Sequence, residues 1–445
     1  MKQPLSLSLL SPRGVLCVTI AIWFACLVAP FNSYTLVQDT DAYFVMFGFV
    51  AAFVVGTFIW KQPQPGALLP RHDSDHAYRR AFTIILMIAG IGLALRFYDL
   101  LAVKHFADYQ SASDFRLAEV DEGQRSTGGL SAISLLLYPV SLVAFLLSLY
   151  LHKRLHMWQR VTALGCLAAF VGYFMMQGGR SPFAVTAIMT AAVVVLRSAV
   201  DPEMPLVGRR KFLLIAGVIC GFAGFVYYSA HVMQSRLESF GVKDPVEYIT
   251  VAEQARGFVV NEPYRSMLNS DSSMMASIAM TGSSMTYYFN HGFFDFSELY
   301  IGEKKHQPLG GVMQFAPIVQ FLNNVGVKTT TVDEGQERIP RPGAFYTFFG
   351  NVLIDYGVIG GFIYCFCLGA FVQLLWIRAR AGSILGLLLY PFFVSVIFHF
   401  PMLDMIAGGY GLFVIFGIFL SVGLIRYFGA LDQIRQRRMA VLRAA

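Results

Sequence analysis

The residues best suited to chemistry are four arginines in polar, Gly- or Pro-punctuated connections between apolar segments: Arg180, Arg265, Arg338 and Arg341. A guanidinium keeps its charge at physiological pH and binds phosphate oxygens through a two-pronged fork of N–H donors. These arginines therefore predict a site for a phosphate or pyrophosphate group. The alternative is that they are solvated or form ion pairs with acidic neighbours such as Glu303, Asp333 and Glu337.

Asp355 is a different kind of candidate, because it lies inside an apolar stretch. An ionisable side chain at membrane depth is costly and usually faces a cavity or a partner. The run from Phe345 to Trp376 is about 32 residues, or about 48 Å as one helix, and the hydrocarbon core is only ~30 Å thick. We therefore expect a broken helix, interrupted around Gly357 or at 360–361, with Asp355 either lining a cavity or capping the helix that begins near Gly357.

An aromatic cluster, "YYFNHGFFDF" at 287–296, contains the third group of candidates. Aromatic faces stack on sugars, and amides hydrogen-bond to hydroxyls, which predicts sugar binding by Tyr287, Tyr288 and Asn290. His291 is the favoured general base because an unperturbed histidine titrates near neutrality. His306 and His399 compete for this role, and an aromatic belt at the membrane interface is the alternative for the whole cluster.

The elements that must position these residues are transmembrane helices. The 445-residue chain is 56% hydrophobic and only 14% charged, whereas soluble domains are about a quarter charged. Apolar runs long enough to cross a bilayer recur along it. The expected fold class is an all-α polytopic membrane protein with about ten spans: 14–30, 42–60, 81–103, 130–151, 159–177, 182–200, 212–230, 345–377, 383–400 and 405–426.

These spans predict three regions. Residues 1–230 form an N-terminal bundle of about seven helices, and residues 345–445 form a C-terminal bundle of about three with a basic tail. Between them, residues 231–344 form one large external loop, too long to be a mere connection. A second, smaller external loop covers 104–129.

Orientation follows from the Lys and Arg residues of alternate connections, because positively charged loops stay in the cytoplasm. All the strongly basic connections and the C-terminal tail fall on one side, so we expect both termini to be cytoplasmic. The net charge of +7 is then explained by topology and by contact with membrane lipid. It requires no nucleic-acid partner.

Several chemistries lack their sequence signatures. The chain has no P-loop, no dinucleotide fingerprint and no H-E-x-x-H motif, and its six cysteines lie in apolar runs without a zinc-site spacing. We expect no cofactor and no metal. Any energy source would be an ion gradient or a substrate that arrives already activated in the membrane.

Two short patches carry a family resemblance. "GAFYTFFGNVLIDYGVIGGFIY" after a large external loop, with its Asp355-Tyr356-Gly357 element, and the turn "QGGRSPF" around Arg180 resemble bacterial oligosaccharide repeat-unit polymerases of the O-antigen polymerase (Wzy-type) family. The number of spans and the single dominant outer loop are also similar to that family.

The resemblance implies a metal-independent, inverting, membrane-embedded glycosyltransferase in the bacterial inner membrane. It would join undecaprenyl-pyrophosphate-linked oligosaccharides into O-antigen, capsule or exopolysaccharide at the periplasmic face, in contact with a chain-length regulator. Arg180 and Arg341 would bind the pyrophosphate, with Arg265 and Arg338 as secondary candidates. His291 or Asp355 would accept the proton of the attacking hydroxyl.

Two rival functions share parts of this pattern. An O-antigen ligase would transfer the finished polymer to lipid A core by similar chemistry. A flippase of lipid-linked oligosaccharides would instead show internal repeats, polar residues near the midplane and short external loops. The single large outer loop favours polymerisation over transport.

Overall fold

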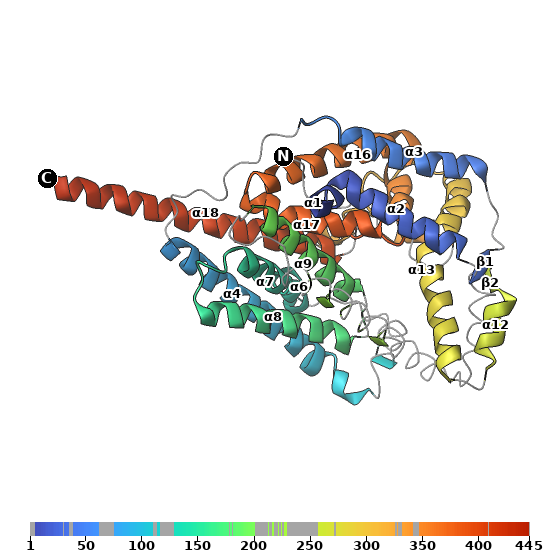
Figure 1. The fold of residues 1–445 in the computed structure, drawn as a ribbon, viewed down its shortest axis with the longest axis horizontal. Coiled ribbons are helices and arrows are strands. Elements are labelled where there is room, and N and C mark those ends of the chain that lie inside the picture. The colour runs from blue at the N-terminus through green and yellow to red at the C-terminus, as the bar shows by residue number, and fades with distance from the viewer. Residues whose placement is uncertain are drawn as a thin grey trace. The chain divides into compact units, whose positions relative to one another are not determined.

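Figure 1 shows the fold of the protein in a computed structural model. The structure describes residues 5–29, 31–34, 39–61, 75–109, 114–115, 129–177, 179, 181–200, isolated positions between 212 and 228, and then 257–270, 273–324, 327, 332–340, 347–407 and 409–444. Within these ranges the chain is almost entirely helical, which agrees with the predicted all-α class.

Five described helical segments are long and apolar enough to cross a membrane. They are α4 (Asp75–Tyr98) with the following π-helical turn η1 (Asp99–Val103), α6 (Gly129–Leu137) with α7 (Val140–Tyr150), α8 (Met157–Met176), α16 (Phe348–Arg380) and α18 (Gly409–Ala444). Four shorter apolar helices are α2 (Pro12–Val28), α3 (Thr40–Gly56), α9 (Ser181–Val200) and α17 (Ile384–His399). The expected span 212–230 lies outside the continuously described residues, and the count of ten stays a prediction.

The chain divides into two compact units, and each combines early and late parts of the sequence. Unit 1 comprises Met1–Lys61, Val226–Leu374 and Phe393–Gly409. Unit 2 comprises Gln62–Phe225, Leu375–Phe392 and Tyr410–Ala445. The sequence-based division at 230 and 344 remains a separate prediction.

Unit 2 is built around α7. This helix packs against α4, α8 and α9, and α4 also packs against α6 and α8. Leu142, Val143, Leu146 and Leu147 on α7 are completely buried, as expected for a helix that is apolar on all sides.

The end of α4 in unit 2 holds a buried ion pair. Arg96 Nη1 donates to Asp99 Oδ2 at 3.3 Å, and Ser131 Oγ donates to the same oxygen at 3.3 Å. The guanidinium also lies over the rings of Tyr138 and Tyr173, at 5.6 and 5.0 Å from their centroids. The cation–π contacts and the Asp99 carboxylate together offset the free-energy cost of burying the positive charge of Arg96.

Unit 1 contains a long helix, α13 (Ser273–Glu303), within the residues for which the sequence predicts the large external loop. It packs against α2, α3 and the short helix α12 (Glu262–Leu268). Phe293 on α13 stacks on Tyr43 of α3 at 4.2 Å and meets Trp23 of α2 edge-on at 5.4 Å. This part of the predicted loop is therefore a core helix of its unit.

A two-stranded antiparallel sheet joins two connections of unit 1. Strand β1 (Asn32–Tyr34) follows α2, and β2 (Phe258–Val260) precedes α12. Ser33 pairs with Val259 at the centre of the register. Tyr34 also stacks on Phe294 of α13 at 4.1 Å, so the sheet is fixed to the helix as well.

Helices α3 and α16 approach closely at two glycines. A Cβ on Gly56 would lie 2.1 Å from the carbonyl oxygen of Phe366, and one on Gly369 would lie 2.0 Å from that of Phe53. Small residues let helix backbones touch, which is a common device in membrane proteins. The contact fixes the middle of α16 within unit 1.

Candidate functional site: a polar core at the broken helix

The candidate site is built around a break in α16. Gly357 has φ 63° and ψ −168°, a conformation that essentially only glycine adopts. The predicted interruption at Gly357 is therefore confirmed. A Cβ there would also come within 3.2 Å of Pro308, so the break lies against residues that precede a Gly-Gly turn at 310–311.

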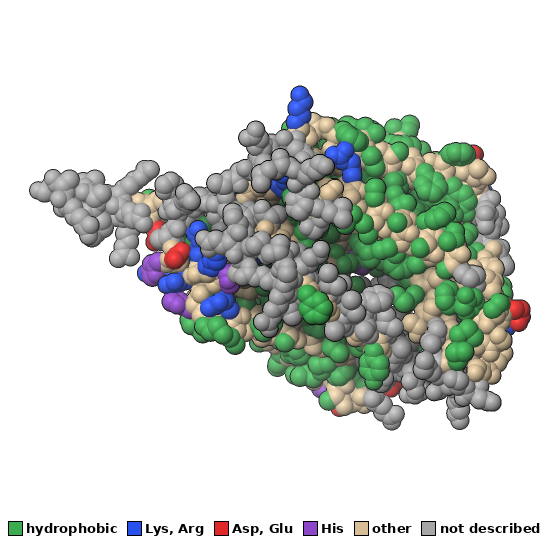
Figure 2. All heavy atoms as spheres, in the orientation of Figure 1, with side chains coloured by type: hydrophobic (Ala, Val, Ile, Leu, Met, Phe, Trp, Pro, Cys, Tyr) green, Lys and Arg blue, Asp and Glu red, His purple; other side chains and the backbone are tan. Residues whose placement is uncertain are grey.

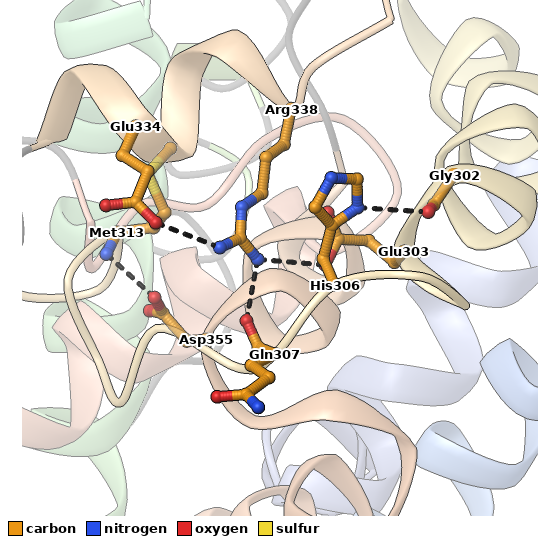
Figure 3. A network of polar contacts seen from close by, with 8 residues as sticks. All are labelled: Gly302, Glu303, His306, Gln307, Met313, Glu334, Arg338 and Asp355. Carbon is orange, nitrogen blue, oxygen red and sulfur yellow. Dashed lines mark hydrogen bonds and ion pairs between the residues drawn. The ribbon is translucent and has the colours of Figure 1, made fainter.

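Asp355 holds that turn through both of its carboxylate oxygens. Oδ1 accepts from the backbone N–H of Met313 at 2.9 Å, and Oδ2 accepts from that of Gln314 at 2.7 Å. The two carbonyls beside the break take part as well, because Leu309 N–H donates to Ile354 and Gly310 N–H donates to Asp355. Figure 3 shows the carboxylate pointing at this segment.

Asp355 acts as a cap, but of a different element from the one expected. Its side chain is completely buried and caps the turn that leads into α14 (Ala316–Asn324), rather than the second half of α16. Backbone N–H donors to a carboxylate are strong, charge-assisted hydrogen bonds. Asp355 therefore fixes the path of residues 309–314 against the broken helix.

A second buried carboxylate, Asp404, lies in the connection between α17 and α18 and is not among the residues predicted from the sequence. It accepts from the side-chain amides of Gln314 and Asn351, the latter at 3.3 Å, and from the backbone N–H of Ile406 at 2.9 Å. Burial raises the pKa of Asp404 to about 6, and its hydrogen bonds act in the opposite direction. In sequence, an acidic residue in a short loop gives no signal of burial.

Gln314 joins the two carboxylates into one network. Its backbone N–H binds Asp355, its side-chain nitrogen binds Asp404, and its side-chain oxygen accepts from Tyr364 Oη at 3.2 Å. The ring of Tyr364 in turn stacks on Tyr356 at 4.8 Å. We call Gln314, Asn351, Asp355, Tyr364 and Asp404 the polar core.

Arg338 binds the residues that lead into the same segment. The guanidinium donates to Glu303 at 3.4 Å, to Glu334 at 3.2 Å and to the carbonyl of Gln307 at 2.7 Å (Figure 3). Only 10% of the Arg338 side chain and 6% of the Glu303 side chain are exposed. The ion-pair alternative is thus the arrangement in the structure, and a phosphate would have to displace a carboxylate.

The pKa of Glu303 reflects this environment. Burial raises it, and the positive charges of Arg338 and His306 act against that rise. The glutamate belongs to the end of α13, whereas Glu334 lies on α15 (Val332–Glu337). Arg338 therefore joins the end of α13 to α15.

The aromatic cluster on α13 is packed inside unit 1. His291 Nδ1 donates to the carbonyl of Tyr287 at 2.9 Å, and the two rings stack at 4.7 Å. Asn290 Nδ2 donates to the carbonyl of Cys26 on α2 at 2.7 Å, and Tyr287 packs on Phe258 of β2. Tyr287, Asn290 and His291 are buried and Tyr288 is half-buried.

One contact relates this cluster to the polar core. A Cβ on Gly292 would lie 2.5 Å from Thr347 Cγ2 and 2.9 Å from the carbonyl oxygen of Pro401. Thr347 begins the approach to α16, and Pro401 lies in the connection that carries Asp404. The middle of α13 therefore borders the same corner of unit 1.

The structure describes three of the five remaining predicted residues. Arg180 and Arg341 fall outside the described residues. Arg265 lies on α12, whose first turn begins with hydrogen bonds to the carbonyl of Asn261. His399 Nδ1 donates to the carbonyl of Ser395 inside α17, and His306 is exposed.

No group of three or more His, Cys, Asp or Glu side chains among the described residues is placed to hold a metal ion. The fold and the site define a multi-pass helical membrane protein, with a buried polar core where one span is broken. Comparison of the chain with protein-family models, curated proteins and solved structures gives no match.

Proposed function

We propose that the chain polymerises undecaprenyl-pyrophosphate-linked oligosaccharide repeat units into a surface polysaccharide, at the periplasmic face of the bacterial inner membrane. The observation that supports this best is the broken α16, where Asp355 binds the Gly-Gly turn of the large external segment. The same Asp-Tyr-Gly stretch carries the resemblance to repeat-unit polymerases.

Non-helical backbone at membrane depth is tolerated only where protein or water surrounds it. A reaction on a lipid-linked sugar needs such a place, because its pyrophosphate and its sugar lie at the headgroup level. The lipid pyrophosphate is itself the activated leaving group, so the reaction needs no nucleotide-binding domain. Arg180 and Arg341 are the proposed pyrophosphate ligands, since a fork of N–H donors stabilises the charge that develops on the departing oxygen.

The geometry changes the roles that we propose for Asp355, His291 and Arg338. Asp355 is a positioning residue, because backbone N–H groups occupy both of its oxygens. His291 is the proposed general base: with Nδ1 donating to Tyr287, the lone pair lies on Nε2. Arg338 positions the external segment between α13 and α15.

Deletion of the gene in its host, followed by gel analysis of surface polysaccharide, tests the proposal. A polymerase deletion leaves single repeat units attached to the acceptor lipid and abolishes long chains. Unligated polymer on the lipid carrier would instead indicate a ligase, and repeat units trapped at the cytoplasmic face would indicate a flippase.

Complementation with Arg180→Ala and Arg341→Ala tests the assigned ligands. Both variants should shorten or abolish the chains while the protein stays at normal levels in the membrane. Arg378→Ala, at the other end of α16, is the matched control and should restore full-length polymer. Normal chain length from both external variants would rule out the pyrophosphate assignment.

A further inference from the structure

One end of the unit 2 helix bundle carries a concentration of positive charge. It is the end where α4 and α8 begin and where α7 and α9 finish. We call it the basic corner, and its cationic residues are Arg79, Arg80, Lys153, Arg154, Arg160 and Arg197. Figure 2 shows Lys, Arg and His side chains close together on one part of the surface, with acidic side chains beside them.

The corner is held together by hydrogen bonds between elements. Arg79 Nε donates to the carbonyl of Arg154 at 2.8 Å, which links α4 to the turn before α8. Gln159 Nε2 donates to the carbonyl of Arg79 and to Thr83 Oγ1, at 2.9 and 3.0 Å. Its oxygen accepts from His156 N–H. The basic side chains are thus carried by a fixed framework.

Two guanidinium groups of the corner have buried donors without an acceptor. Arg154 Nη1 and Arg160 Nε are buried and make no hydrogen bond. The acidic neighbour Asp75 is 3.8 Å from Arg154 Nε and is 56% exposed, which makes a weak pair. The Arg154 guanidinium lies over the ring of Tyr78 at 4.6 Å, and that contact supplies no oxygen acceptor. Each buried unsatisfied donor needs an explanation, and an oxygen-rich partner is the one that we pursue.

An apolar surface continues directly from the corner along α8. Met157, Trp158, Val161 and Leu164 are 66%, 52%, 56% and 57% exposed. Only 28% of the apolar window of α8 is buried, less than in the other four candidate spans. Exposed apolar side chains on a membrane helix face acyl chains, and a tryptophan near the helix end is typical of the interface.

We infer that the basic corner binds the headgroup of an anionic phospholipid, with its phosphodiester on Arg154 and Arg160 and its acyl chains along α8. Arginine forks suit phosphate oxygens, and Lys153 adds charge at the entrance. The adjoining apolar stripe favours a lipid over a free anion. With the expected orientation this end faces the cytoplasm, where basic segments attract anionic lipid.

Native mass spectrometry of the full chain, released from detergent with added lipid, tests the inference. Phosphatidylglycerol and phosphatidylcholine with identical acyl chains are the probes. We expect at least about a tenfold preference for phosphatidylglycerol, because its headgroup carries a net negative charge that the two guanidinium groups and Lys153 attract, whereas phosphatidylcholine has no net charge. Equal binding of the two lipids by the wild type would overturn the inference without any variant.

The double variant Arg154→Gln/Arg160→Gln should lose the preference. The matched control, Arg378→Gln/Arg380→Gln, removes the same charge at the end of α16 and should keep it. Arg154→Lys/Arg160→Lys keeps the positive charges but removes the paired N–H donors of each guanidinium. This variant should retain only part of the preference for phosphatidylglycerol. Wild-type preference in the lysine and glutamine variants alike would contradict the site.

Competition with inorganic phosphate tests whether the basic corner binds a lipid headgroup or any phosphate ion. Added at about a thousandfold excess over lipid, inorganic phosphate should leave phosphatidylglycerol bound, because apolar contacts with α8 add to the affinity for lipid. Complete displacement would mean that the corner is an anion site without lipid specificity, and would overturn the lipid assignment.

Discussion

Two buried aspartates, one in each unit, are satisfied in opposite ways. Asp355 in unit 1 accepts from the backbone N–H groups of Met313 and Gln314, whereas Asp99 in unit 2 accepts from the side chains of Arg96 and Ser131. Both lie where a helix departs from α geometry, at the break of Gly357 and at the π-helical turn η1.

The difference lies in what each carboxylate stabilises. Asp99 balances the positive charge of Arg96. Removing both residues should therefore cost less unfolding free energy than removing Arg96 alone. Asp355 accepts from two backbone N–H groups, and a change of side chain at Met313 or Gln314 does not remove those donors. Asp99 thus stabilises the packing of a helix bundle, and Asp355 fixes the path of a loop beside a membrane helix.

The largest effect is expected from Asp355→Ala. It leaves two buried N–H groups without acceptors, which costs roughly 4 kcal/mol of unfolding free energy because each unsatisfied donor costs about 1–3. Titration with SDS in mixed micelles measures this loss. Long polysaccharide should disappear together with the anchored turn, and a variant with wild-type stability would contradict the anchoring role.

Arg96→Met is expected to cost about 3 kcal/mol, because it leaves Asp99 buried without its counter-charge. The double variant Arg96→Met/Asp99→Leu should recover most of that stability, since replacing both partners of a buried pair is often close to neutral. The same titration measures both. If the double variant were no more stable than the single one, charge balance would not be the function of Asp99.

The next effect concerns pH and Asp404. Its carboxyl binds a proton more tightly in the folded state, with a pKa of about 6, than in the unfolded chain, with a pKa of about 3.9. Unfolding free energy should therefore fall by roughly 2–3 kcal/mol as pH rises from about 4 to about 6. Asp404→Asn should flatten this slope, and an unchanged slope would assign the titration to another group.

The smallest effect is expected at the break itself. Gly357→Ala should cost about 1–2 kcal/mol, because an alanine is strained at that φ and ψ. Gly165→Ala on α8 is a matched control: it meets nothing within 4 Å and should gain up to about 1 kcal/mol of helix propensity. Equal responses at the two glycines would show that the break is not constrained.

The sequence predicted the parts of the fold that depend on length and local composition. The broken helix could be derived because an apolar run of this length exceeds a bilayer and contains glycines at the right place. Helix α13 could not, because its Ser, Thr, Asn and His residues lower its hydropathy and only tertiary packing against α2 and α3 buries them.

Only one of the two carboxylates in the polar core, Asp355, could be predicted from the sequence. Asp355 was conspicuous because it interrupts an apolar run, but its partners lie 41 and 42 positions earlier in the chain. Asp404 lies in a short connection and meets Gln314 at a separation of 90 positions. The sequence identifies a charged residue in an apolar run. Only the fold shows which backbone N–H or side-chain amide donates a hydrogen bond to it.

The small sheet has a consequence for how the protein is made. Ser33 Oγ donates to Asn261 across 228 positions of sequence, so β1 has no partner until β2 has been synthesised. At about 5–20 residues per second this takes roughly 10–50 s. During that interval β1, which lies between α2 and α3, lacks its pairing partner. Nascent-chain length should therefore control when Tyr34 becomes shielded from chemical labelling.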